Sequence, residues 1–135
     1  MIDHHYRGIP AKPGVPCKVK VWRHGRRRNL KPHSYDSRGG WNWGYSGQGP
    51  RGLAEDLLLD VLEDAAKAKV MQSEFARRVV CSWPMDRPWA IEAAEIRRIV
   101  AEIERDGGAS MQRTIEITRT LLETRNRTPI DDLPF

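Results

Sequence analysis

The pattern of apolar and polar positions predicts a β-strand at residues 17–22 and helices over most of the chain beyond residue 50. The two faces of the strand differ: Cys17, Val19 and Val21 lie on one, and Lys18, Lys20 and Trp22 on the other. His24–Gly25 then favours a two-residue hairpin loop, because glycine readily takes a positive φ. The resulting register places Val19 opposite Leu30, Trp22 opposite Arg27, Lys20 opposite Asn29 and Lys18 opposite Lys31. The polar face then opposes like charges, which is unfavourable unless water or an anion intervenes.

An aromatic segment and a series of helices follow the hairpin. Trp41, Trp43 and Tyr45 alternate, so we expect a short strand with all three aromatic side chains on one side. Helical spacing predicts four helices, lined by Leu53–Leu62, by Ala68–Val79, by Ile96–Ile103 within about Ile91–Arg105, and by Met111, Ile115, Leu121 and Leu122. Pro50 suits the first helical turn, Asp64 and Ser110 can cap the second and fourth helices, and breaks follow at Trp83–Pro84 and Gly107–Gly108. The predicted fold class is α+β: a small antiparallel β-hairpin or three-stranded sheet packed against three to four helices.

The 135 residues suffice for one domain. Residues 1–16 hold two glycines and three prolines, so we expect no regular element there and assign them to a Pro/Gly-rich arm. Residues 17–127 then form a single α+β domain, and residues 128–135 a flexible tail. No apolar stretch approaches the roughly 18 residues that cross a bilayer, and the two distant cysteines suggest reduced thiols. We therefore expect a protein of the host-cell cytoplasm that does not contact membranes.

Charge divides the chain into two unlike regions. Residues 1–52 carry eleven Lys/Arg against two Asp, a net charge of +9, whereas residues 53–135 carry twelve Lys/Arg against sixteen Asp/Glu, a net charge of −4. Such asymmetry suggests contact with nucleic acid or another anionic surface. A basic surface that serves solubility alone is the alternative.

The basic residues gather around the predicted hairpin. We expect a contact with nucleic acid, a nucleoprotein complex or an acidic protein through eight side chains: Lys18, Lys20, Trp22, Arg23, Arg26, Arg27, Arg28 and Lys31. A two-stranded ribbon with a basic tip fits a nucleic-acid groove, and a tryptophan on the same face can stack on an unpaired base. The alternative is a solvated turn whose arginines cover the tryptophan by cation–π contact.

A glycine loop immediately before the first helix is a possible anion site. Its residues are Tyr45, Ser46, Gly47, Gln48 and Gly49, and backbone N–H groups at a helix start attract anions. The loop is not a Walker loop, because no Gly-Lys-Ser/Thr follows, and it is not a dinucleotide fingerprint, which needs a parallel β unit around it. The alternative is a tight turn in which aromatic side chains pack over the helix.

The sequence contains no recognisable metal or catalytic motif. His4, His5, Cys17, His24 and His33 match no zinc pattern, so we expect no metal and no cofactor. No histidine falls in a recognisable nucleophile setting with a serine or cysteine. An active site would have to combine the glycine loop with an arginine or histidine from a distant part of the sequence. We therefore expect no catalytic residue and no enzymatic activity.

One segment resembles a known family. The run Trp43-Gly44-Tyr45-x-Gly47-x-Gly49-Pro50-x-x-Leu53-Ala54 resembles small uncharacterised proteins of phages, prophages and bacteria, classed as a domain of unknown function. The resemblance covers roughly residues 17–104 and implies a compact α+β domain associated with mobile elements. It carries over no catalytic residue. Two departures are Glu55–Asp56, where small or apolar residues are expected, and residues 119–135, which form an extension.

These features lead to one main hypothesis and two alternatives. The main hypothesis is a non-enzymatic binding protein of a phage or mobile element, which docks its basic hairpin on nucleic acid or a nucleoprotein complex. A counter-defence inhibitor such as an anti-CRISPR fits this size and charge. The first alternative is a small domain that binds an anionic or phosphate ligand, or acts on one, at Gly47–Pro50. The second alternative is a structural component of a virion.

Overall fold

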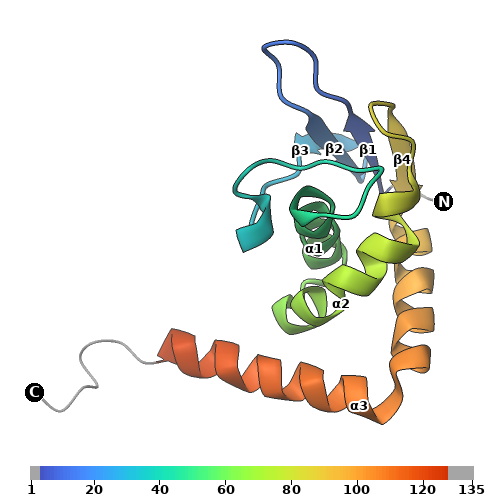
Figure 1. Cartoon of the computed structure of the whole chain (residues 1–135). Coiled ribbons are helices and arrows are strands. Elements are labelled where there is room, and N and C mark those ends of the chain that lie inside the picture. Colours follow the sequence, from blue (N-terminus) through green and yellow to red (C-terminus); the bar gives the residue numbers. More distant parts are fainter. Residues whose placement is uncertain (1–3, 128–135) are drawn as a thin grey trace, which may run out of the picture.

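Four antiparallel strands form one sheet in the order β3-β2-β1-β4, in a computed structural model that describes residues 4–127. The strands are β1 (His4–Ile9), β2 (Lys18–Arg23), β3 (Arg26–Asn29) and β4 (Trp89–Glu92). Helices α1 (Gln48–Leu62), α2 (Ala65–Arg78) and α3 (Ala93–Arg127) lie to one side of the sheet, with short 3-10 turns at Tyr35–Ser37 and Val80–Ser82 (Figure 1). The expected α+β fold is confirmed, with four strands in the sheet rather than two or three. The expected tail, residues 128–135, lies outside the described residues.

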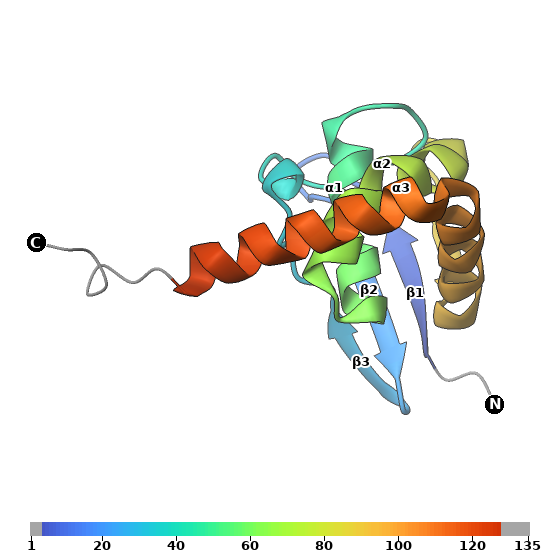
Figure 2. The same ribbon diagram turned by 90° about the horizontal axis from the view of Figure 1, so that it is seen from below.

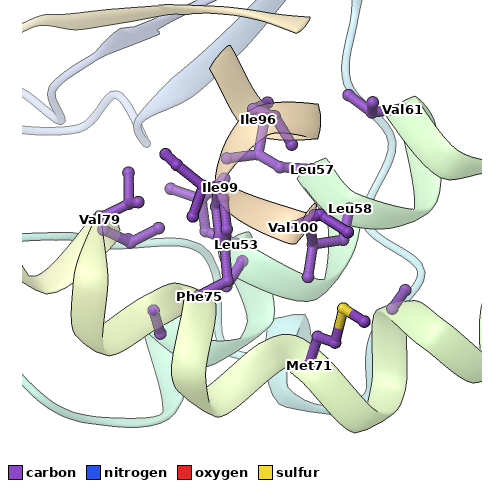
Figure 3. Close-up of a cluster of buried hydrophobic side chains, with 14 of the residues drawn as sticks. Leu53, Leu57, Leu58, Val61, Met71, Phe75, Val79, Ile96, Ile99 and Val100 are labelled. Atoms are coloured by element: carbon purple, nitrogen blue, oxygen red, sulfur yellow. The ribbon is translucent and has the colours of Figure 1, made fainter. Parts of the chain in front are cut away.

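The core lies between the inner face of the sheet and the helices. Leu57 of α1, Phe75 of α2 and Ile96 of α3 are fully buried and belong to one cluster of apolar side chains (Figure 3). Val19 and Val21 of β2 join this cluster from the sheet. The periods of two and of 3.6 residues thus identify the buried faces of the hairpin, of α1 and α2, and of the first half of α3.

Strand β1 corrects the expectation that residues 1–16 hold no regular element. It pairs with β2 on one side and with β4 on the other, so it is an interior strand. The prolines that suggested an irregular arm lie only in the connection after Ile9, where they break no strand pairing. Gly8 is tolerated within the strand because the ring of Trp89 packs against its backbone.

Strand β4 was also not expected, and the strand expected at Trp41–Tyr45 is wrong. Residues 41–45 form an irregular loop. The Asn42 side chain accepts a hydrogen bond from the Trp43 backbone N–H at 2.9 Å, and Gly44 has a φ of 88°, so the segment cannot continue a ladder. The Trp43 ring is buried and its indole N–H donates to the Arg87 carbonyl at 3.0 Å. The alternation does not reflect a strand: Trp43 is in the core, Trp41 packs against it half-buried, and Tyr45 is exposed beside Gly47.

The β2–β3 hairpin confirms the register predicted from its turn. Lys20 lies opposite Asn29, and Trp22 lies opposite Arg27. His24 and Gly25 both have positive φ, of 55° and 74°, as a tight two-residue loop requires. The turn chemistry therefore fixes which residues of the hairpin face the helices.

The helices match part of their expected boundaries: α3 begins at Ala93 rather than near Ile91, and Ser110, expected as a cap, lies inside it. Pro50 lies in the first turn of α1, and Asp64 caps α2 by accepting the Lys67 backbone N–H. Helix α2 ends at Arg78, before the expected stop at Trp83–Pro84. The backbone of α3 breaks at Gly108, where φ is 59°, and its second half turns across α2 (Figure 2). Within residues 4–127, no helix combines the length and apolar character that crossing a membrane requires.

One apolar position on the second half of α3 was assigned incorrectly. Ile115 is buried as expected, but Leu121 is 64% exposed. Beyond the ion pair between Arg119 and Asp64 at the start of α2, the helix extends past the rest of the molecule (Figure 2). Its last turns therefore have less of the domain to pack against.

Two buried carboxylates of α1 hold the loop between β3 and α1. Asp56 is 1% exposed and accepts four donors: His33 N–H at 3.0 Å, Ser34 N–H at 2.8 Å, Ser37 Oγ at 2.6 Å and Trp41 Nε1 at 2.8 Å. Glu55 accepts hydrogen bonds from Ser34 Oγ and from Gln72. This explains the charged pair at a position where small or apolar residues were expected. The carboxylates are buried because the loop supplies their partners.

Candidate nucleic-acid interface

The outer face of the sheet is the face directed away from the helices. Side chains alternate along each strand, so the burial of Tyr6, Val19 and Val21 assigns their neighbours to this face. The outer face comprises His5, Arg7 and Ile9 of β1, Lys18, Lys20 and Trp22 of β2, Arg27 and Asn29 of β3, and Ala90 and Glu92 of β4. Every one of these residues is exposed or half-buried. The sheet therefore has one face packed against the helices and one face open.

An aromatic cluster lies at the centre of the outer face. The rings of His5 and Trp22 stack with their centroids 5.0 Å apart and an interplanar angle of 5°. The Arg7 guanidinium lies 5.3 Å from the centroid of the Trp22 ring, within the range of a cation–π contact. His5 and Arg7 were not expected here, because residues 1–16 were assigned to an irregular arm. The sequence signal that could have identified them is the alternation of an apolar Tyr6 with polar His5 and Arg7, which is typical of a strand with one buried face.

Most charge on the outer face is positive. Lys18 and Arg27 are exposed and make no ion pair among residues 4–127, while Lys20 donates a hydrogen bond to Asn29. Because Asn29 is neutral, this pair of positions carries no like-charge repulsion. Like charges do lie opposite each other at the hairpin tip, where Arg23 and Arg26 are paired across the two strands and both are exposed. The tip extends beyond the helices (Figure 2).

Arg28 does not share the outward orientation expected of the hairpin arginines. It lies opposite Val21 on the inner side, and its Nη2 is 2.8 Å from Asp60 Oδ1 and 3.0 Å from Oδ2. The Tyr6 hydroxyl donates to Asp60 at 2.5 Å and lies 2.8 Å from His4 Nε2. Arg28 is thus a link between β3 and α1, because its charge is compensated within the protein.

Burial controls the electrostatics of this link. It lowers the pKa of His4, with the positive charge of Arg23 acting in the same direction. Burial and the hydrogen bond to Asp60 raise the pKa of Tyr6. Both groups are therefore neutral near pH 7, so neither adds a charge beside the Arg28–Asp60 ion pair.

Lys31 and Arg23 line a separate groove between β3 and α1, with a volume of about 540 Å³. The same groove is lined by Asp60 and Glu63, so its charge is mixed. The eight residues expected to form one surface therefore divide among three places. Lys18, Lys20, Trp22 and Arg27 lie on the outer face, Arg26 lies at the tip with Arg23, which also lines the groove, and Arg28 and Lys31 lie beside the groove.

The glycine loop lies at the start of α1, away from this surface. Gly47 precedes the helix, and no side chain caps the first turn. The Tyr45 ring packs beside Gly47, and its hydroxyl lies close to Gly49. These contacts match the alternative in which Tyr45 packs over the helix start. Among the described residues, no group of three His, Cys, Asp or Glu side chains is arranged to hold a metal ion.

Fold and site together define a small α+β domain with one open, basic sheet face. The chain belongs to a family of unknown function (DUF6166), whose model matches residues 7–102. The match extends from β1 into the first half of α3, so it includes most of the outer face and ends before Gly108. No curated protein and no solved structure matches the chain.

Proposed function

We propose that this protein is a non-enzymatic binding protein that contacts nucleic acid through the outer face and the hairpin tip. The observation that carries the proposal is the open sheet face with a Trp22–His5–Arg7 cluster among uncompensated cations. Lysine and arginine side chains neutralise phosphates, while aromatic rings contact bases. The net charge of +9 over residues 1–52 supports the same partner.

Neighbouring arginines on β3 provide a matched test. Arg27 faces outward, whereas Arg28 is paired with Asp60. Replacing Lys20 and Arg27 together by alanine is expected to weaken binding to a nucleic acid about 20-fold, because two phosphate contacts are lost. The Arg28→Ala variant is expected to bind within about twofold of wild type. Fluorescence anisotropy with a labelled oligonucleotide at fixed salt measures both.

Thermal unfolding of each variant shows whether the fold is retained. Arg28→Ala removes an ion pair that is half-exposed, so it remains folded with a modest loss of stability. Equal weakening by the Arg28→Ala variant and by the Lys20→Ala/Arg27→Ala variant would show that orientation on the sheet does not matter. Undetectable binding of wild type to every oligonucleotide would reject the proposed function.

The setting that we propose is a phage or other mobile element acting inside its host cell. The resemblance at Trp43–Ala54 supports it. In that setting, a small basic protein can act as a counter-defence inhibitor, such as an anti-CRISPR, by binding the nucleic acid or nucleoprotein complex that a defence system uses. The identity of the neighbouring genes tests this setting independently of binding.

A further inference from the structure

A hollow of about 490 Å³ lies on the outer face beside Trp22. We call it the notch, and its lining is mostly apolar, with Ile9 of β1, Trp22 of β2, and Pro88 and Ala90 at β4. Arg7, which lies over the Trp22 ring, also lines it. The notch exists because Ala90 presents only a methyl group where the register places it opposite Arg7.

The shape and chemistry of the notch suit a flat, partly apolar group. Its volume lies within the range of about 300–1,000 Å³ that is typical of small-molecule sites. An aromatic ring and a guanidinium group, both able to stack on a planar partner, line it together. His5 stacks on Trp22 and restricts the tryptophan, so the wall is ordered before a ligand arrives.

Charge selects the occupant and its orientation. Lys18, Lys20 and Arg27 lie on the β2–β3 side of the notch. On the other side, Glu92 lines a neighbouring hollow and makes no ion pair among residues 4–127, whereas Glu95 in the same hollow is paired with Arg98. A ligand with negative charge on one side and a flat apolar group on the other therefore fits in one direction only, with phosphates over β2 and the flat group toward β4.

We propose that the notch takes an unpaired nucleobase, so that the preferred ligand is single-stranded nucleic acid. This inference rests on the proposed function and specifies its substrate class. In a duplex the faces of the bases are stacked inside the helix, so an internal base reaches the notch only after unstacking. A single strand presents its bases without that cost, while its phosphates contact the lysines of β2.

Three labelled probes of equal length separate the base from the backbone: a single strand, a duplex, and an abasic strand that keeps only sugars and phosphates. Wild type is expected to bind the single strand about tenfold more tightly than the abasic strand, the value of roughly one stacked base. The duplex is also expected to bind more weakly than the single strand. Anisotropy titrations at one salt concentration give the three affinities.

Ala90→Leu fills the notch without removing a charge or an aromatic ring. It is expected to weaken binding of the single strand about tenfold and to leave binding of the abasic strand unchanged. Ala94→Leu, on the exposed side of α3, is the matched control and is expected to change neither affinity. Trp22→Leu is a second variant, which keeps an apolar side chain but removes the stacking ring. It is also expected to weaken binding of the single strand and to leave binding of the abasic strand unchanged.

The outcomes distinguish this inference from the proposed function. Equal affinity for all three probes, with no effect of Ala90→Leu or Trp22→Leu, would reject the inference that the notch holds a base. Binding of the nucleic-acid backbone by the outer face would still stand. Failure of every probe to bind would reject both. Preference for an acidic peptide carrying an aromatic residue over all three probes would also reject both, because the notch would then hold a protein side chain.

Discussion

Asp56→Ala is expected to lower the free energy of unfolding by about 4 kcal/mol, because four buried or half-buried donors lose one acceptor. Two of these donors are backbone N–H groups of the loop after β3. No other described side chain accepts a hydrogen bond from them. Burial of unpaired donors costs roughly 1–3 kcal/mol each, and water entering the site offsets part of the sum. Urea denaturation followed by circular dichroism measures the change.

Glu123→Ala provides the control for loss of a carboxylate. Glu123 is exposed on the second half of α3, so its replacement is expected to change stability by no more than about 0.5 kcal/mol. Asp56→Asn is expected to be intermediate, since the amide keeps one acceptor oxygen. A loss below about 1 kcal/mol for Asp56→Ala would mean that the loop does not depend on this carboxylate.

Gly8→Ala is expected to lower the free energy of unfolding by about 3 kcal/mol, because the new methyl group would overlap the Trp89 ring. That ring has little space to move. It stacks on Trp83 with centroids 4.0 Å apart and meets Trp43 edge-on at 5.7 Å. The strain therefore falls on three tryptophans of the core or on the pairing of β1 with β4. Chemical denaturation quantifies it, and near-ultraviolet circular dichroism reports the tryptophan environment.

Gly39→Ala is the corresponding control. A Cβ at Gly39 would meet no atom within 4 Å, so this substitution is expected to be neutral or slightly stabilising. If Gly8→Ala were as stable as Gly39→Ala, the close packing of Trp89 on β1 would be wrong. The position of Ala90 beside the notch would then be wrong as well, because both residues belong to β4.

Local features of the fold were predictable from the sequence, whereas long-range pairing was not. The His24–Gly25 turn determines the hairpin register, and Asp64 marks the start of α2, because each acts on adjacent residues. Strands β1 and β4 pair with each other from distant parts of the chain, and neither has a turn that identifies it. Composition alone was misleading at β1, since its glycine is required by a tryptophan that lies far away in sequence.

In the candidate site, too, local features were predictable from the sequence and contacts between distant strands were not. Lys20, Trp22 and Arg27 were placed on one face by alternation, and the structure keeps them there. The inward position of Arg28 was also predictable, because the register sets it opposite the buried Val21. His5 was not predictable as a partner of Trp22, because that contact requires the pairing of β1 with β2.

Salt dependence of nucleic-acid binding tests the central claim most directly. If Arg7, Lys18, Lys20 and Arg27 of the outer face and Arg23 and Arg26 of the tip each neutralise one phosphate of a single strand, the logarithm of the association constant falls with the logarithm of salt concentration with a slope of about −4. In the Lys20→Ala/Arg27→Ala variant the slope becomes about −3. A slope near zero, or the same slope in wild type and variant, would contradict the assignment of the outer face as the binding surface.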